Sequence, residues 1–257
     1  SMKEQASQVL AADLVLRSAA PLPAVFQAEA RKIGLATAET LAFPTVVLVG
    51  EETALAAVDA VGDGYPLRGQ LTIADTLFGD GRPATAIPAR GEAWAEPGLL
   101  GRLDIDVGAT LTIGNLTLRV TQVLQYKPDQ NIGFVNLAPG VMVNLADVPA
   151  MSVVKPGSRV TWHQMYAGSD AQIAEFRTRV EPRLRPDTSI RGREDAGEQI
   201  NAAIDRAQRF LTLASLVTVI LAAVAAAMAA RRYALRHLDN IALLKTLARE
   251  KGTAMML

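Results

Sequence analysis

One run of 21 residues, from Phe210 to Ala230, contains no charged residue, proline or glycine. An α-helix rises about 1.5 Å per residue, so this run would extend roughly 30 Å, the thickness of the hydrocarbon core of a bilayer. Its apolar residues would cover all sides of the helix rather than one stripe. The alternative is a buried core helix of a soluble protein, but such helices are usually shorter. The run therefore predicts a transmembrane helix at 210–230.

Basic residues are distributed unevenly around this run. Arg206 and Arg209 precede it among acidic residues, whereas six basic residues follow it: Arg231, Arg232, Arg236, Lys245, Arg249 and Lys251. Cytoplasmic loops carry the excess of Lys and Arg. We therefore expect the C-terminus in the cytoplasm and residues 1–209 outside it, which for a protein of a bacterial cytoplasmic (inner) membrane means the periplasm.

Two patterns near the C-terminus indicate helix packing. Ala222, Ala226 and Ala230 recur every four residues, which would let another transmembrane helix approach closely, although general alanine richness explains the pattern equally well. After the membrane, apolar residues recur every three positions among charged ones, and the set comprises Leu238, Asp239, Ile241, Leu244, Lys245 and Leu247. This amphipathic helix either rests on the membrane surface or docks into a groove of a cytoplasmic partner.

The outer region contains two strand–helix–strand units, one near each end. In the first, residues 12–17 alternate like a strand, Phe26, Ala30 and Ile33 lie on one helical face, and strands follow at 46–49 and 54–58. The second has a strand at 159–166, a helix that includes Phe176 and Val180, and a strand at 188–190. Two such units predict an α+β fold with two helices on one face of a sheet.

The region between these units differs in composition. It is rich in glycine and proline and its expected strands are short. Gly114-Asn115 separates two strand-like runs, 110–113 and 116–123, and suits a tight hairpin turn. We expect a β-rich lobe inserted into the α+β lobe. The predicted division is an α+β lobe at 1–67 and 155–190, an inserted lobe with linkers at 68–154, a stalk at 191–209, the membrane helix at 210–230 and a cytoplasmic coupling helix and tail at 231–257.

The sequence offers no constellation typical of an enzyme. A formal net charge of zero argues against nucleic acid as a partner, and the lack of cysteine excludes thiolate chemistry. There is no phosphate-binding loop for ATP. His163 and His237 are predicted on opposite sides of the membrane, so they cannot share a site. Asp104 and Asp106 are expected in a turn, and Glu92 and Glu96, which flank Trp94, on a solvated face. We predict no catalytic, metal or cofactor site.

Segments along nearly the whole chain resemble FtsX-like, MacB-type ABC transporter permeases, and within them the YbbP-like branch. In the outer region these segments are residues 10–16, 65–69, 91–97, 137–142 and 156–160, and near the C-terminus they are residues 210–214, 228–233 and 238–247. The resemblance corresponds to the first periplasmic domain and the second transmembrane helix of such permeases. Two departures occur: the family usually continues Leu-Gly-Ala after the position of Leu247, where this chain has Ala248-Arg249-Glu250, and residues 251–257 do not follow the pattern.

The resemblance implies a porter-like α+β lobe with an inserted β-rich lobe. It also implies a cytoplasmic ATPase subunit that contacts the helix after the membrane, and transmission of ATP-driven motion to the periplasm by a non-catalytic permease. The branch is associated with hydrophobic or lipid-like compounds and a periplasmic esterase, so membrane lipid and further permease helices are expected partners. Other permease helices are missing, so a partial protein is expected. The alternative is a single-pass receptor or sensor with an extracytoplasmic binding domain.

Overall fold

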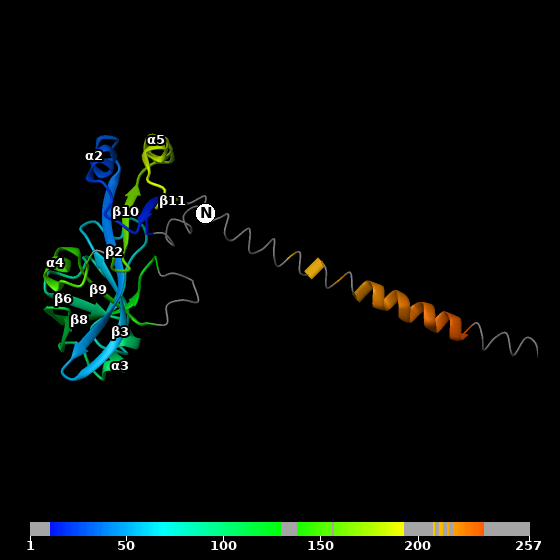
Figure 1. Ribbon diagram of the computed structural model, residues 1–257. Helices are drawn as coiled ribbons and strands as arrows, with labels where there is room; N and C mark the ends of the chain where they lie inside the picture. The colour runs from blue at the N-terminus through cyan, green and yellow to red at the C-terminus, as the bar shows by residue number, and fades with distance from the viewer. Residues whose placement is uncertain are drawn as a thin grey trace, which may run out of the picture. The chain divides into compact units, whose positions relative to one another are not determined.

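The computed structural model describes residues 11–129, 138–155, 157–192, 208, 211, 212, 215 and 218–233. The chain divides into two compact units, Ser1–Gly197 and Glu198–Leu257. The first unit contains the strands and helices α2 to α5, and the described part of the second unit is helical (Figure 1).

A four-stranded antiparallel sheet carries two helices on one face. Its strands lie in the order β11 (Thr188–Gly192), β1 (Leu14–Ser18), β10 (Thr161–Ala167) and β2 (Ala36–Val49). Helices α2 (Ala24–Lys32) and α5 (Asp170–Val180) connect them in a β-α-β-β-α-β order. The two predicted strand–helix–strand units therefore share one sheet. Figure 1 shows α2 and α5 beside each other at one end of the unit.

Local sequence signals explain where these helices begin and end. Pro23 precedes the first turn of α2, and Gly34, with a φ of 84°, follows its end. Ser169 and Gln172 form a capping box at the start of α5. Both helices bury apolar residues against the sheet, and the cluster beneath them includes Leu14, Leu16, Phe26, Tyr166 and Phe176.

The remaining strands close into a barrel. β2 pairs with β3 (Glu52–Val61), β3 with β9 (Gly140–Asn144), β9 with β6 (Glu92–Ala95), β6 with β8 (Leu116–Tyr126), β8 with β7 (Thr110–Ile113), and β7 returns to β2. The short strands β4 (Thr72–Ala74) and β5 (Arg82–Pro83) extend this sheet beyond β8. The predicted hairpin at Gly114-Asn115 joins β7 to β8.

Small residues fill the interior of this barrel. A barrel of six strands encloses little space, so inward positions must carry small or medium side chains. Ala54, Ala56 and Ala60 of β3 and Ala93 and Ala95 of β6 are at most 5% exposed and pack with the valines and leucines of the other strands. Helix α3 (Pro97–Leu103) adds Leu99, Leu100 and Leu103 to this core. The other short helices of the first unit are η1 (Leu145–Asp147), α4 (Val148–Met151) and η2 (Glu181–Arg183).

Strands β2 and β3 do not follow the predicted division of the chain into an α+β lobe and an inserted lobe. Residues 36–42 of β2 pair with β10 in the helix-covered sheet, whereas Val47 and Leu48 pair with β7 in the barrel. The same side-chain alternation runs through β2, so Leu41, Phe43 and Val47 all join the barrel core. The barrel therefore includes residues from the segment 1–67 that the sequence assigned to the α+β lobe, because one long strand serves both parts.

Within the second unit, residues 218–233 are helical, as are the described positions between 208 and 215. The helix predicted at 210–230 lies partly outside the described residues. Among the residues that are described, no helix combines the length and the apolar character that crossing a membrane requires.

Candidate functional site

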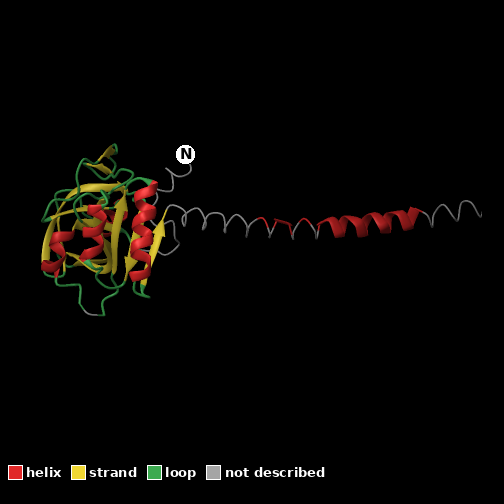
Figure 2. Ribbon diagram, turned by 90° about the horizontal axis from the view of Figure 1, so that it is seen from above, coloured by secondary structure: helices red, strands yellow, loops and turns green. Residues whose placement is uncertain are grey.

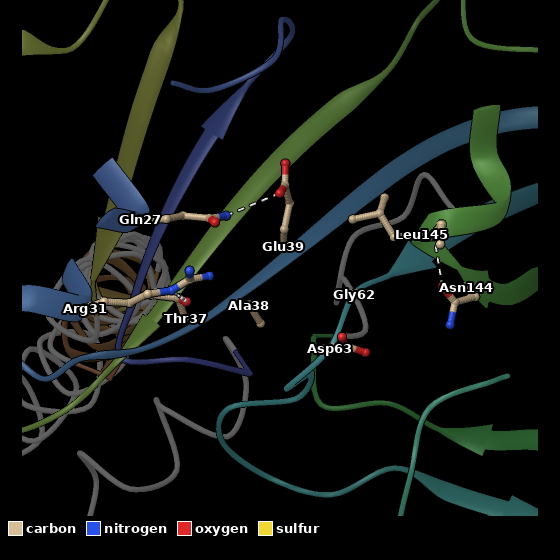
Figure 3. Close-up of a pocket in the computed structure, with 10 residues that line it drawn as sticks. Gln27, Arg31, Thr37, Ala38, Glu39, Gly62, Asp63, Asn144 and Leu145 are labelled. Atoms are coloured by element: carbon tan, nitrogen blue, oxygen red, sulfur yellow. Dashed lines mark hydrogen bonds between the residues drawn. The ribbon is translucent and has the colours of Figure 1, made fainter. Parts of the chain in front are cut away.

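An open pocket of about 350 Å³ lies between helix α2 and the segment that follows β9 (Figure 3). Gln27 and Arg31 of α2 form one wall, and residues 144–146 at the start of η1 form the opposite wall. Residues 37–39 of β2 lie between the walls, together with Gly62 and Asp63, which follow β3. The pocket thus forms where the helix-covered sheet meets the barrel, beside the shared strand β2 and the end of β3.

Hydrogen bonds between residues of α2 and β2 hold the polar side chains on one side of this pocket. The amide Nε2 of Gln27 donates to Oε2 of Glu39 at 3.2 Å, and Nε of Arg31 donates to Oγ1 of Thr37 at 3.4 Å. Figure 3 shows Arg31 and Asp63 on different sides of the pocket. The arrangement offers one guanidinium and two carboxylates in a single solvent-open space.

Gly62 allows two segments of the pocket to approach each other closely. The backbone N–H of Gly62 donates to the carbonyl oxygen of Glu39 at 2.9 Å, which brings the segment after β3 close to β2. A Cβ atom at Gly62 would lie 3.0 Å from that oxygen and 3.4 Å from Cδ2 of Leu145. Any larger residue would therefore crowd the pocket floor.

Asn144 stabilises the wall opposite α2. Its Oδ1 accepts from the N–H of Ala146 at 3.0 Å, which caps η1, and its Nδ2 donates to the carbonyl oxygen of Pro88 at 2.9 Å. Both ends of the amide are therefore used in the fold, so Asn144 shapes the pocket wall.

A second polar cluster lies outside the barrel, near the end of β8. Lys127 is 8% exposed and forms an ion pair with Asp59 of β3, and the hydroxyl of Tyr65 donates to Asp129 at 2.6 Å. Burial raises the pKa of Asp59. Burial also raises the pKa of the Tyr65 hydroxyl well above its ordinary value, and the nearby Asp129 adds to that effect. These bonds fix the chain just after β8, and the ion pair itself adds little stability because removing both charges from water offsets their attraction.

His163 lies in a strand, as predicted, opposite Thr40 of β2. Its Nδ1 lies 3.2 Å from Oγ1 of Thr40. Burial, together with the positive charge of Arg17, lowers the pKa of His163 to about 4. The imidazole is therefore neutral at physiological pH and serves as a hydrogen-bonding residue of the sheet.

The predicted solvated face around Trp94 is wrong. Trp94 is 5% exposed, and both neighbouring glutamates are partly buried. Glu92 accepts from Thr121 at 3.3 Å, and Glu96 accepts from the N–H of Gly140 at 2.7 Å. Strand spacing places both glutamates where they satisfy groups of neighbouring strands, which an alternating pattern alone does not reveal.

The structure does not bring catalytic groups together in the part of the chain that it describes. No cluster of three or more His, Asp or Glu side chains there could hold a metal ion. Asp104 takes a left-handed conformation, with a φ of 52°, at the end of α3, which agrees with the predicted turn.

Of the residues predicted to pack or couple helices, Ala222, Ala226 and Ala230 lie in the helical stretch 218–233 and are exposed. The predicted coupling residues Leu238, Asp239, Ile241, Leu244, Lys245 and Leu247 lie outside the described residues. Sequence reasoning missed Arg31, Glu39 and Asp63 because each is an ordinary surface residue in its own segment. Asp59 carried a usable signal, since an acid among the alanines and valines of a strand needs a partner.

Comparison with known proteins places these observations in context. The chain matches no protein-family model. It is 33% identical over 246 residues to the uncharacterized ABC transporter permease YbbP of Escherichia coli (strain K12), a match that covers 96% of this chain. The chain spans only 30% of the length of that relative.

Two solved structures resemble parts of this chain, each with 10% sequence identity and a TM-score of 0.47. One is the extracellular domain of the noncanonic ABC-type transporter YknZ from Gram-positive bacteria, with 70% of this chain and 100% of that domain covered. The other is the periplasmic region of MacB from Actinobacillus actinomycetemcomitans, with 76% and 95% covered. The sequence match to YbbP confirms the predicted resemblance to the YbbP-like ABC transporter permeases, for a segment equal to about a third of such a protein.

Proposed function

We propose that the chain is the part of an ABC transporter permease that carries its first periplasmic domain, its second transmembrane helix and the start of a cytoplasmic coupling helix. The observation that supports this proposal is the 33% identity to YbbP over 246 residues. Because only 11 of the 257 residues fall outside that match, it extends across both compact units. A single-pass receptor is not favoured, because the similar protein is a permease.

In this proposal the permease is non-catalytic and a separate cytoplasmic ATPase hydrolyses ATP. The coupling helix, defined by Leu238, Asp239, Ile241, Leu244, Lys245 and Leu247, binds the ATP-bound and ATP-free forms of that ATPase unequally. Without such a difference, no conformational equilibrium would shift. Motion then passes through 210–230 and the stalk 191–209 to the outer domain, which extracts or exports hydrophobic or lipid-like compounds. Membrane lipid and a periplasmic esterase are the further partners of this proposal.

The sequence of 210–230, which has no charged residue, proline or glycine, supports the proposed membrane location. In the described stretch 218–233, apolar side chains are exposed, among them Val219, Leu221 and Met228 at 62–64%. A continuous apolar surface of this kind normally contacts lipid or other helices. The proposal assigns the face of Ala222, Ala226 and Ala230 to other helices of the same permease.

Replacing Ile241 by Asp tests the coupling helix. In the complete permease, expressed with its ATPase, the new charge would enter an apolar contact at a cost of roughly 2 kcal/mol or more. We expect the loss of ATPase co-purification and of lipid-stimulated ATP hydrolysis, while the outer domain folds normally across the membrane. Thr246→Asp is the matched control, because at about 100° per residue it lies on the opposite side of the helix. Wild-type behaviour of a correctly inserted Ile241→Asp protein would assign the helix to the membrane surface instead.

A further inference from the structure

The pocket between α2 and η1 holds charges of both signs that are not paired with each other. Glu39 uses only Oε2, in its bond with Gln27. Arg31 uses only Nε, in its bond with Thr37. Among the described residues, no hydrogen bond or ion pair engages the terminal amino groups of Arg31 or the carboxylate of Asp63. Three charged groups therefore face one solvent-open space with their main bonding capacity unused.

Each of the two charges near α2 is held by a neutral side chain and not by a charge of opposite sign. Gln27 of α2 restrains the carboxylate of Glu39, and Thr37 of β2 restrains the guanidinium of Arg31 (Figure 3). Asp63 lies on another side, after β3. A ligand with separated charges could satisfy both kinds of group without breaking either bond.

We propose that this pocket binds a small zwitterion that carries a primary ammonium group and an oxyanion. The ammonium group donates its N–H bonds to Glu39 and Asp63, and the oxyanion accepts from the planar guanidinium of Arg31. The volume of about 350 Å³ is at the lower end of the range for small-molecule sites.

Two sources present this chemistry. One is a free amino acid, and the other is a phospholipid headgroup in which a phosphate and a primary amine lie close together. The charged groups of the pocket recognise the ammonium group and the oxyanion that both sources present. The inference uses only the groups that line the pocket, so it does not depend on the permease assignment.

Four soluble probes separate the possibilities. The complete 257-residue chain, labelled with ¹⁵N in a non-ionic sugar detergent, would be titrated with glycine, glycerophosphoethanolamine, glycerophosphocholine and glycerol 3-phosphate while the amide resonances of Gly62 and Asp63 are followed. We expect saturable shifts with the first two probes. Glycerophosphocholine lacks N–H donors and glycerol 3-phosphate lacks a cation, so both should bind about tenfold more weakly or worse. Tighter binding of glycine indicates an amino acid, and tighter binding of glycerophosphoethanolamine indicates a headgroup.

Neutral variants test the assigned contacts. Arg31→Gln and Asp63→Asn should each weaken binding by about tenfold or more, since each removes one charged hydrogen-bonding group. The exposed Arg102 of α3 lies outside the pocket, so Arg102→Gln is the matched control and should leave binding unchanged. The proposal is overturned if all four probes behave alike, if none saturates, or if Arg31→Gln and Asp63→Asn bind as tightly as the Arg102→Gln control.

Discussion

Asp13 connects three parts of the first unit through one buried carboxylate. It is 1% exposed, accepts from Nη2 of Arg68 at 2.8 Å and from Nε of Arg68 at 3.1 Å, and accepts from the N–H of Gly168 at 3.0 Å. The bonds tie the start of β1 to the connection after β3 and to the end of β10. The carboxylate also raises the pKa of the Arg68 guanidinium through their hydrogen bonds.

Replacing Asp13 by Ala should lower the free energy of unfolding by about 3 kcal/mol, because the N–H of Gly168 and the guanidinium of Arg68 would lose their acceptor. Urea unfolding followed by circular dichroism measures the change. Asp75→Asn, at the solvent-exposed ion pair with Arg82, is the control and should have little effect. Equal losses in the two variants would show that burial of Asp13 does not matter.

His163 should make the stability of the first unit sensitive to acid. Its folded-state pKa of about 4 lies below the ordinary value of 6.5, so below pH 6.5 the unfolded chain binds a proton that the folded chain does not. This contribution is fully present above pH 6.5 and is lost as the pH falls towards 4. His163→Gln should therefore reduce the drop in unfolding free energy between pH 7 and pH 5. An unchanged drop in this variant would assign the acid sensitivity to other groups.

Single residues of the candidate site were harder to predict than single residues of the core. Phe26, Ala30 and Phe176 follow a helical period, and the structure buries them as expected. Arg31 and Glu39 share the pocket only because α2 packs over β2, so their relation depends on tertiary structure and leaves no local pattern.

The β7–β8 hairpin depends on a glycine at its turn. Gly114 has a φ of 57°, and a Cβ atom there would lie 2.0 Å from the carbonyl oxygen of Met151 and 2.5 Å from Cγ1 of Val153. The turn therefore packs directly against the segment after α4, and the hairpin and that helix are positioned together.

We expect Gly114→Ala to lower the free energy of unfolding by about 2 kcal/mol or more, since it adds a backbone clash to the strain of a positive φ. Gly91→Ala is the matched control: its φ is 81°, but no atom lies within 4 Å of the added Cβ. It should cost about 1 kcal/mol. Thermal or urea unfolding of both variants measures the difference, and equal costs would contradict the close contact with Met151.

At the level of elements, local signals predicted α2, α5 and the β7–β8 hairpin, because caps, periodicity and a Gly-Asn turn act within a few residues. Closure of the barrel was not predicted. It depends on parallel pairing of β3 with β9 and of β6 with β8, strands that are not consecutive in the sequence, and β3 and β6 carry many alanines. Alanine has low strand propensity, and it is selected here by the narrow interior rather than by the strand itself.

The predicted topology of the whole chain can be tested by reporters. A reporter fused after Leu257 should be active only if it functions in the cytoplasm, and one inserted near Asp80, an exposed residue between β4 and β5, only if it functions in the periplasm. The physical reason is the excess of Arg and Lys after Ala230. The reverse pattern of activity would refute both the orientation and the permease proposal.

The sharing of β2 between the helix-covered sheet and the barrel limits how such domains can be recombined. Deleting 68–154 would leave β3 without β9, and β2 without β7, and would expose the inward alanines of β3 to water. Grafting only that segment between related chains would pair one chain's barrel strands with another chain's β2 and β3. A functional chimera therefore requires that all six barrel strands come from a single parent, so the helix-covered sheet must be exchanged with them.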